Sequence, residues 1–452
     1  MADGQGDAPK GGMMDGLRAL HRTMPKSVAE PSRADAPAAA PARRRSGSLG
    51  ADVTTHPAFR QMAIARTAAE VTGLASPFFR TVDRVEGIRA EIGGAWVDHF
   101  ASYDYLSMND HPRLAAAAAA AVARYGVSSR AARPAGGNLA LHEDLDAALA
   151  DLLGTEAALV TVSGHATNVA IIRTLMGPDD VVLADALSHN SVFEGIRASG
   201  ATHVSIPHDD PDWLDDWLTR NRASYGRALV AIEGLYSMDG DTADLAAFVD
   251  VKERHDAWLT LDEAHSLGVL GATGRGLCEA TGVDPRRVDV IMGTLSKSFC
   301  SCGGVIAASR DLVDMLRYNA PGFVYSVGMS VPNAAATLEA VRLMRDEPER
   351  VGRLASRGAT MKRLMEERGL DVGPCEGHAV TPVIIGDSLR TAWVSNGLLE
   401  DGINVPCMIA PALPDRSARL RFFLNADHDD ATLERAADAT AARIRASRDV
   451  RL

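Results

Sequence analysis

The chain has 452 residues and a formal net charge of −12, and 46% of its residues are hydrophobic. This composition allows a large buried core, which excludes a wholly disordered chain, and the acidic balance argues against a bulk nucleic-acid binder. No apolar run approaches the roughly 20 residues that cross a bilayer, and the N-terminus lacks the apolar segment of a secretory signal, so we expect a cytoplasmic protein without a membrane span.

The composition divides the chain into four parts. Residues 1–54 are rich in Ala, Pro, Arg, Ser and Gly, and such a segment buries too little apolar surface to fold, so a flexible leader is expected. Residues 55–107 form an N-terminal segment, residues 108–328 a large domain, and residues 329–452 a smaller C-terminal domain.

Short apolar runs without polar alternation recur through the large domain, as strands buried on both faces do. Helical segments separate most of these runs, and the alternation predicts βαβ units in a mostly parallel sheet of an α/β fold. The predicted strands are residues 158–162, 181–185, 203–207, 228–233, 258–262, 290–294 and 304–309. The predicted helices are residues 165–177, 190–200, 212–226 and 243–256.

The pattern changes near Pro332, where long helical segments replace the strand–helix alternation. The C-terminal part is predicted to hold four helices and two strands, which indicates a smaller α+β domain. The helices are residues 332–347, 349–369, 388–402 and 429–447, and the strands are residues 379–386 and 419–424.

The five cysteines are few and odd in number: Cys278, Cys300, Cys302, Cys375 and Cys407. They predict reduced thiols and not a disulfide framework. Cys300 and Cys302 have the spacing of half a metal site, but no further His or Cys follows at the spacing of a third and fourth ligand. We therefore expect packed thiols there and no metal.

Lys297 is the most informative residue of the chain. It lies in the motif GTLSKS, directly after a predicted buried strand. Small hydroxylated neighbours can bind a phosphate, and a lysine in this setting can form a Schiff base with a carbonyl cofactor. The letters S-K-S are also common in surface loops, so this motif alone leaves both interpretations open.

Asp262 ends the predicted strand WLTLD, and His265 follows three residues later. A carboxylate at the end of a strand can stabilise the protonated ring nitrogen of a pyridoxal cofactor, with the histidine near the phenolic oxygen. A helix-capping aspartate beside a core histidine is the alternative. Asp262 precedes Lys297 by 35 residues (297 − 262), which leaves room for one crossover between adjacent strands.

Two further motifs follow predicted strands. In residues 161–168, TVSGHATN, a glycine at the start of a helix lets the backbone approach a phosphate. His189 lies beyond the strand VVLAD, where an imidazole can stack on a flat ring. Each signal is weak alone, because such turns and lone histidines are often structural. All four strand-end motifs fit one ligand, and this agreement strengthens each of them.

Taken together, these motifs resemble the α-oxoamine synthase family. The residues that carry the resemblance are SYDYLSMNDHP, SGHATN, DALSHNSVFEG, EGLYSMDGD, DEAHSLGVLGATGRG, GTLSKS and ARLRFF, within about residues 75–445. The resemblance implies a fold-type I pyridoxal-phosphate (PLP) transferase, with a mostly parallel seven-stranded sheet in the large domain and a smaller α+β C-terminal domain. It also implies a decarboxylative condensation of an amino acid with an acyl thioester.

The resemblance implies a role for each motif residue. Lys297 would bind the cofactor and move the substrate's α-proton, and Asp262 would pair with the pyridinium nitrogen. His265 would reach the phenolic oxygen, and His189 would stack on the ring. The other residues expected to contact the cofactor are Gly164, His165, Ser237, Thr294, Ser296 and Ser326. In this family the residue at Ser326 serves the neighbouring subunit's phosphate, which implies a homodimer with shared active sites.

The chain departs from the biotin-pathway branch of the family at the substrate site. Ile409 stands where that branch has an arginine for the amino-acid carboxylate, and the sequence leaves open whether Arg419 or Arg421 replaces it. Many relatives have Asn-Asp-Tyr-Leu-Gly at residues 103–107, where this chain has YDYLS, and an aromatic residue is common at His165. These departures resemble the polyketide and secondary-metabolism branch, whose members often take the acyl group from an acyl-carrier protein.

Two alternative functions remain at this point. One is another fold-type I activity, such as an aldolase or an aminotransferase. The other is a catalytically silent partner subunit, which the presence of Lys297 argues against. The sequence names neither the amino acid nor the acyl chain.

Overall fold

The computed structural model describes residues 51–72, 74–410, 413 and 416–450. The leader predicted over residues 1–54 therefore lies almost wholly outside the described residues. The chain divides into two compact units, residues 1–68 and residues 69–452. The described part of the first unit contains the short 3-10 helix η1 (Val53–Thr55), which Asp52 caps, and the start of helix α2 (Pro57–Thr72).

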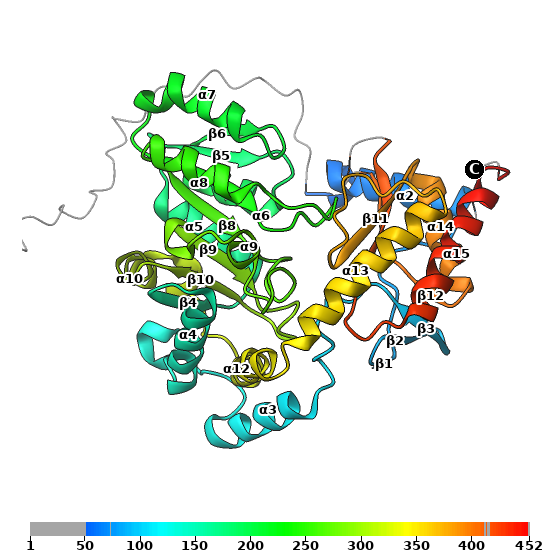
Figure 1. The fold of residues 1–452 in the computed structure, drawn as a ribbon, viewed down its shortest axis with the longest axis horizontal. Helices are drawn as coiled ribbons and strands as arrows, with labels where there is room; N and C mark the ends of the chain where they lie inside the picture. Colours follow the sequence, from blue (N-terminus) through cyan, green and yellow to red (C-terminus); the bar gives the residue numbers. More distant parts are fainter. Residues whose placement is uncertain (1–50, 73, 411–412, 414–415, 451–452) are drawn as a thin grey trace, which may run out of the picture. The chain divides into compact units, whose positions relative to one another are not determined.

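A seven-stranded sheet forms the centre of the second unit, in the order β4-β10-β9-β8-β7-β5-β6 (Figure 1). Six of the seven strands run in the same direction, and β10 is antiparallel to both of its neighbours, so the prediction of a mostly parallel sheet is confirmed. The strands are β4 (Ala157–Thr161), β5 (Val181–Asp185), β6 (Thr202–Ile206), β7 (Ala228–Glu233), β8 (Trp258–Asp262), β9 (Val290–Thr294) and β10 (Gly304–Ala308).

Helices cover both faces of this sheet because alternate strand residues bury apolar side chains on opposite sides. On one face the packed helices are α5 (Gly164–Leu175), α6 (Asn190–Ser199), α10 (Arg310–Asn319) and α11 (Pro321–Val324). On the other face they are α4 (Ala140–Leu153), α7 (Pro211–Asn221), α8 (Leu245–Arg254), α9 (Leu277–Thr281) and α12 (Val331–Asp346). Helix α3 (Pro112–Tyr125) packs against α12, and short turns complete the region: η2 (Arg133–Gly137), η3 (Arg222–Ser224) and η4 (Pro285–Arg287).

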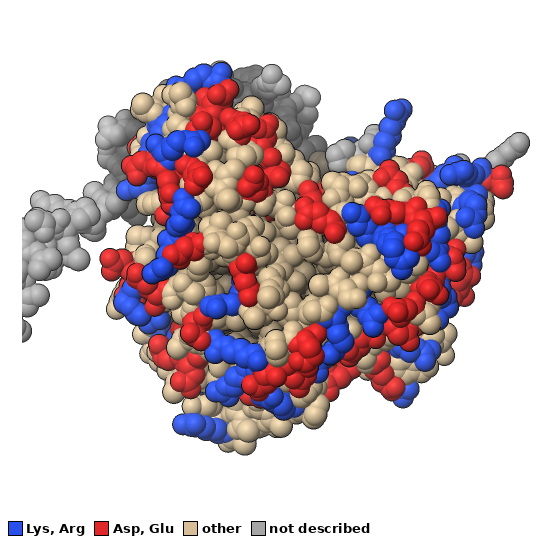
Figure 2. Space-filling model, viewed as in Figure 1, with Lys and Arg blue, Asp and Glu red and all other residues tan. Residues whose placement is uncertain are grey.

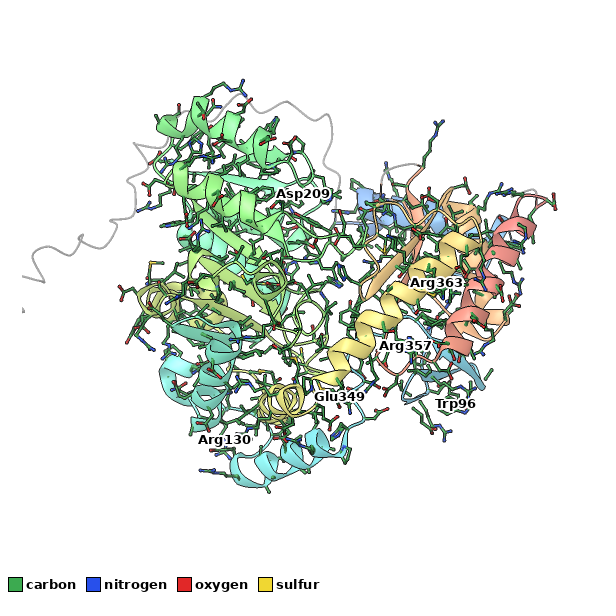
Figure 3. All side chains as sticks on the ribbon, in the orientation of Figure 1. Trp96, Arg130, Asp209, Glu349, Arg357 and Arg363 are labelled. Atoms are coloured by element: carbon green, nitrogen blue, oxygen red, sulfur yellow. The ribbon has the colours of Figure 1, made fainter. Side chains whose placement is uncertain are left out.

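Helix α13 (Glu349–Glu367) leads from α12 toward two smaller sheets (Figure 1). Figure 3 labels Glu349, Arg357 and Arg363 along it, and Arg357 forms an ion pair of 2.5 Å with Asp430 of the terminal helix α15 (Asp430–Ser447). One small sheet joins β11 (Val380–Gly386), β14 (Ala418–Phe423) and β13 (Cys407–Met408). The other joins β1 (Arg84–Glu86), β2 (Arg89–Ile92), β3 (Ala95–His99) and β12 (Ile403–Asn404), and α14 (Ser388–Glu400) packs beside both.

The strand order reverses beside β5, because β6 lies on one side of it and β7 on the other. In open α/β sheets, ligands bind outside the carboxyl ends of the strands at such a reversal. Asp185, Glu233 and Asp262 end three adjacent strands there, and Glu233 and Asp262 are direct neighbours in register. The fold therefore gathers chemically active side chains at one edge of the sheet.

Three further observations concern the molecule as a whole. Among the described residues, no helix is long and apolar enough to cross a membrane. All five cysteines are free, as predicted. Acidic and basic side chains are interspersed over the face in Figure 2, around a mostly uncharged and hollowed central region, so the net charge does not gather there as one patch.

Candidate active site

A cavity of about 420 Å³ lies at the carboxyl ends of the central strands. Nine of the ten residues predicted to form the site line it: Gly164, His165, His189, Ser237, Asp262, His265, Thr294, Ser296 and Lys297. Ser326 is not among the lining residues. The structure thus brings together motifs that lie up to 133 residues apart (297 − 164).

Asp262 is held in place by two hydrogen bonds at the end of β8. Its Oδ2 accepts from the Asn168 side-chain amide at 2.7 Å, and its Oδ1 accepts from the Ala264 backbone N–H at 2.9 Å. The side chain is buried, although it lines the cavity. A buried carboxylate fixed by two neutral donors can stabilise a cation placed before it.

His265 contacts a tyrosine from the N-terminal segment. Its Nδ1 lies 2.7 Å from the Tyr105 hydroxyl, and both side chains are buried. Burial lowers the pKa of His265 well below its usual range, with a further contribution from the nearby Lys297 charge. The imidazole is therefore neutral, so it can hydrogen-bond a ring oxygen without adding positive charge.

His189 is the N-cap of α6, and its backbone N–H donates to Glu233 Oε1 at 2.5 Å. The His189 Nδ1 lies 2.8 Å from Ser191 Oγ, which fixes the ring orientation. Burial lowers the pKa of His189, so this imidazole is also neutral. Burial, together with Asp262, raises the pKa of Glu233 well above its usual range.

Lys297 follows β9 and lies between charges of both signs. Burial lowers the pKa of Lys297 to about 8, against the opposing influence of Asp262 and Glu233. Its Nζ lies 5.7 Å from the centre of the Tyr103 ring. An amine with this pKa is partly neutral near physiological pH, which a nucleophile or a base requires.

The start of α5 lines the cavity. Ser163 is the N-cap, and the first turn of a helix leaves backbone N–H groups without intrahelical acceptors. Gly164 packs directly on Thr294: a Cβ at this glycine would lie 2.7 Å from Thr294 Oγ1. Thr294 Oγ1 in turn lies 2.8 Å from Ser296 Oγ. Free N–H groups, hydroxyls and a close backbone are the features of a phosphate cradle.

Arg421 lines the cavity from β14, and its Nη1 donates to the Ser237 backbone carbonyl at 2.9 Å. Arg419 lies on the same face of the strand, but it does not line the cavity, because it forms an ion pair with Asp239. Ile409 is partly buried against the hydrophobic core and is also absent from the cavity wall. Most of the segment that follows it, including Pro411, lies outside the described residues.

Ser163, beside Gly164 in the predicted phosphate turn, also lines the cavity, and sequence reasoning missed the other residues of its wall: Tyr103, Asn168, Ser191, Glu233, Met238, Ala264, Met292, Met408 and Arg421. Some of them left a signal, because Asn168 belongs to the motif SGHATN and Glu233 ends a predicted strand. Arg421 left only the open question raised by Ile409. Tyr103 and Met408 reach the cavity through tertiary packing, which the sequence pattern does not encode.

Comparison with known proteins explains this geometry. The aminotransferase class I and II family matches residues 98–439. An 8-amino-7-oxononanoate synthase from Geobacter sulfurreducens is 39% identical over 365 residues, which cover 80% of this chain and 92% of that protein. A serine palmitoyltransferase from Sphingobacterium spiritivorum is 34% identical over 351 residues, which cover 78% of this chain and 87% of that protein. The chain belongs to the aminotransferase class I and II family, in its α-oxoamine synthase group.

The fold agrees with this membership. A serine palmitoyltransferase from S. paucimobilis, solved with a bound PLP–myriocin aldimine, superposes with a TM-score of 0.84 at 28% identity, covering 88% of this chain and all of that one. The Sphingomonas wittichii serine palmitoyltransferase gives a TM-score of 0.84 at 29% identity, covering 89% of this chain and all of that one. The predicted fold-type I transferase fold is therefore confirmed. In this chain, the side chains that line the cavity lie at the carboxyl ends of the central strands.

Proposed function

We propose that this chain is a PLP-dependent C-acyltransferase, which condenses an amino acid with an acyl thioester. The reaction releases CO2 and a free thiol and gives an α-amino ketone. The observation that carries the proposal is the meeting of Lys297, Asp262, His189 and His265 in one cavity of a chain with α-oxoamine synthase relatives.

The residues of the cavity fit PLP. The start of α5 suits a phosphate, because Gly164 lacks the Cβ that would lie 2.7 Å from Thr294 Oγ1 and so lets the backbone and this hydroxyl lie close together. Asp262 is a buried acceptor suited to a protonated ring nitrogen, and the neutral His265 suits the ring's phenolic oxygen. Lys297 has the lowered pKa that a Schiff-base lysine needs. When bound, PLP supplies an electron sink for the charge left on the substrate by removal of its α-proton.

Each of the chain's own residues then has a separate role in the reaction. Lys297 Nζ takes the α-proton from the amino acid, since burial keeps part of its population neutral. The Asp262 carboxylate would hold a proton on the ring nitrogen of a bound cofactor, and Asn168 and Ala264 fix the orientation of that carboxylate. His189, fixed by Ser191 and Glu233, would pack against a flat cofactor bound in the cavity and exclude water there.

The proposal also covers the acyl donor, the oligomeric state and the cellular location. An acyl-carrier protein is a candidate donor, on the resemblance to the secondary-metabolism branch.

A homodimer is supported by exposed apolar side chains near Ser326: Met315, Tyr318, Tyr325 and Val327 are between 41% and 87% exposed. In such a dimer Ser326 would face the other subunit's phosphate site. The free cysteines support a cytoplasmic location.

Thiol release tests the proposed reaction. PLP-loaded protein is incubated with each of the twenty amino acids and with acyl-pantetheine thioesters of graded chain length, which carry the thioester arm shared by coenzyme A and carrier proteins. We expect free thiol to appear only when an α-amino acid and a thioester are both present. A keto acid or an aldehyde formed without thiol release would instead indicate an aminotransferase or an aldolase and would contradict the proposal.

A further inference from the structure

A chain of hydrogen bonds connects Asp262 with His189 along the cavity wall. The Asn168 Nδ2 lies 2.7 Å from Asp262 Oδ2 and 2.9 Å from Ser191 Oγ. Ser191 Oγ in turn lies 2.8 Å from His189 Nδ1. Asn168, Ser191 and Asp262 are all buried, so their polar hydrogens must find acceptors within the protein.

The direction of each bond follows from the groups at its two ends. A carboxylate oxygen only accepts, so the end of the Asn168 side chain that faces Asp262 is its NH2 group. The second hydrogen of this group points to Ser191 Oγ, which therefore accepts. The hydroxyl hydrogen of Ser191 is then directed to His189 Nδ1, and Ser191 is the donor of that bond.

The backbone of Ser191 requires the same state of the imidazole. His189 is the N-cap of α6, and the Ser191 backbone nitrogen lies 3.3 Å from its Nδ1. A backbone N–H can only donate, so Nδ1 carries no hydrogen. The neutral imidazole then carries its hydrogen on Nε2. With Nδ1 taken, Nε2 is the nitrogen left for a ligand in the cavity that His189 lines.

Capping of α6 alone does not account for this arrangement. A cap needs only one side-chain acceptor, which serine, aspartate or asparagine supplies without further partners. Ser188 provides an internal comparison, because its hydroxyl is buried next to His189 and has no hydrogen-bond partner among the residues that the structure describes. The hydroxyl of Ser191 is oriented by a neighbour that also holds Asp262, whereas that of Ser188 is not.

We propose that Asn168 and Ser191 are positioning residues, which hold His189 as its Nε2–H tautomer and so make it a hydrogen-bond donor to the ligand in the cavity. The same amide orients Asp262, so one side chain sets the hydrogens at both places. This inference rests on the proposed function for the identity of that ligand. His189 then has no free nitrogen to accept the α-proton, which agrees with the role proposed for Lys297.

Nitrogen-15 NMR of PLP-loaded protein, labelled at histidine, measures this state directly. The two ring nitrogens differ widely in chemical shift when only one carries a hydrogen, and His189→Gln assigns the signals. At neutral pH we expect the hydrogen of His189 on Nε2 alone, in PLP-loaded and in cofactor-free protein. A hydrogen on Nδ1, or on both nitrogens, would overturn the assignment. The cofactor-free measurement does not depend on the proposed function.

Variants test whether Asn168 and Ser191 cause this state. Ser191→Ala removes the hydroxyl that donates to Nδ1, and Asn168→Ala releases this hydroxyl from its orientation. Both changes make it easier for Nδ1 to take a proton, so the titration midpoint of His189 should rise by about half a pH unit or more. Ser188→Ala is the matched control, since it removes a hydroxyl without a described partner, and its midpoint should equal that of the wild type.

The charged and titratable groups around His189 are unchanged in these variants, so the differences report the hydrogen bonds. These groups are Asp262, Lys297, His165, Arg421 and Glu233. The thermal midpoint of each variant shows whether it is folded. Equal NMR midpoints for Ser191→Ala and Ser188→Ala would overturn the proposal.

The absorbance of bound PLP tests the second contact of Asn168. Its pH titration should shift in Asn168→Ala, which loses the bond to Asp262, and should not shift in Ser191→Ala, which keeps that bond. The same titration in both variants would overturn the separate role of Asn168. A wild-type protein that binds no PLP would contradict the proposed function itself, and the NMR of the cofactor-free protein would still decide the tautomer.

Discussion

The ammonium of Lys297 owes its low pKa to a balance of opposing influences. Burial favours the neutral amine and Arg421 adds to this effect, whereas Asp262 and Glu233 favour the charged form. Burial prevails, so the pKa is about 8 and not the ordinary 10.5. At neutral pH roughly a tenth of the lysine is then already unprotonated, which a surface lysine does not achieve.

This balance predicts a distinct titration for Lys297. In cofactor-free protein, its modification rate by trinitrobenzenesulfonate should rise with a midpoint near pH 8, because only the neutral amine reacts. Peptide mass spectrometry of partially modified protein separates it from Lys362, a surface lysine that lies 3.8 Å from Glu366. A midpoint for Lys297 above pH 10 would show that the site does not activate it.

Gly164 is the second residue on which the site depends. Its backbone packs on Thr294, and a methyl group there would lie 2.7 Å from Oγ1 and 2.9 Å from Cβ, so either the start of α5 or the threonine must move. Gly164→Ala should therefore weaken PLP binding by about tenfold, measured by absorbance titration of the cofactor-free protein, with less than about 1 kcal/mol change in unfolding free energy.

The matched control for this change is Gly352→Ala in helix α13. No heavy atom lies within 4 Å of a Cβ added there, and alanine favours a helix, so PLP binding should stay as in the wild type. If Gly164→Ala bound PLP as tightly as this control, the start of α5 would not be the phosphate site.

At the scale of elements, His208 joins the loops that follow three strands. Its Nδ1 lies 3.0 Å from Asp185 Oδ1 at the end of β5, and its Nε2 lies 2.7 Å from Asp241 in the loop after β7. The neighbouring Asp209, labelled in Figure 3, accepts from the Asp244 backbone at 2.9 Å. These contacts fix the loop that carries Ser237 into the cavity.

The hydrogen bonds of His208 to Asp185 and Asp241 make the free energy of unfolding depend on pH. Burial lowers the pKa of His208, but the hydrogen bonds to Asp185 and Asp241 outweigh burial and raise it to about 10. Because the folded pKa lies above the unfolded value of about 6.5, the stabilisation is complete below pH 6.5 and is lost as pH rises to about 10.

His208→Gln should accordingly lower the unfolding free energy by about 2 kcal/mol at pH 6, and by progressively less as the pH approaches 10. Urea denaturation across this range measures the difference. His203→Gln on β6 serves as control, since burial lowers the pKa of that histidine and no carboxylate partner raises it. A penalty for His208→Gln that stays constant from pH 6 to pH 10 would refute the ion-pair account.

The sequence predicted the elements of the central sheet well, and the reason is physical. Strands buried on both faces leave unbroken apolar runs, so each of the seven predicted strands lies within one residue of an observed one. Strand β1 was not predicted, because all three of its residues are exposed and no apolar run marks it. The Tyr105–His265 contact spans 160 residues, and no local pattern encodes it.

At the scale of the whole molecule, the cavity draws on distant parts of the chain. Tyr103 comes from the N-terminal segment, Lys297 from the central sheet, and Arg421 from the small sheet near the C-terminus. The predicted domain boundaries at residues 108 and 329 remain a prediction. The site residues from all three segments lie in one compact unit, so a change in any segment can alter substrate binding.

The proposed homodimer is tested at this scale by its mass. Light scattering should give twice 47.8 kDa, or 95.6 kDa. The double variant Tyr325→Asp and Val327→Asp should shift the mass toward 47.8 kDa, because both side chains are at least half exposed and would lie in the interface. Leu389→Asp, at a less exposed position on α14, should leave the dimer intact. A wild-type mass of 47.8 kDa would contradict the assembly.

The stoichiometry of CO2 and thiol tests the central claim most directly. PLP-loaded protein is given carboxyl-labelled amino acid, of whichever kind supports thiol release, together with the acyl thioester, and labelled CO2 and free thiol are counted in the same reaction. The account predicts equal amounts of the two from the wild type, each dependent on both substrates, and a loss of at least about a hundredfold in Lys297→Ala. Thiol release without CO2, or equal yields from Lys297→Ala, would contradict it.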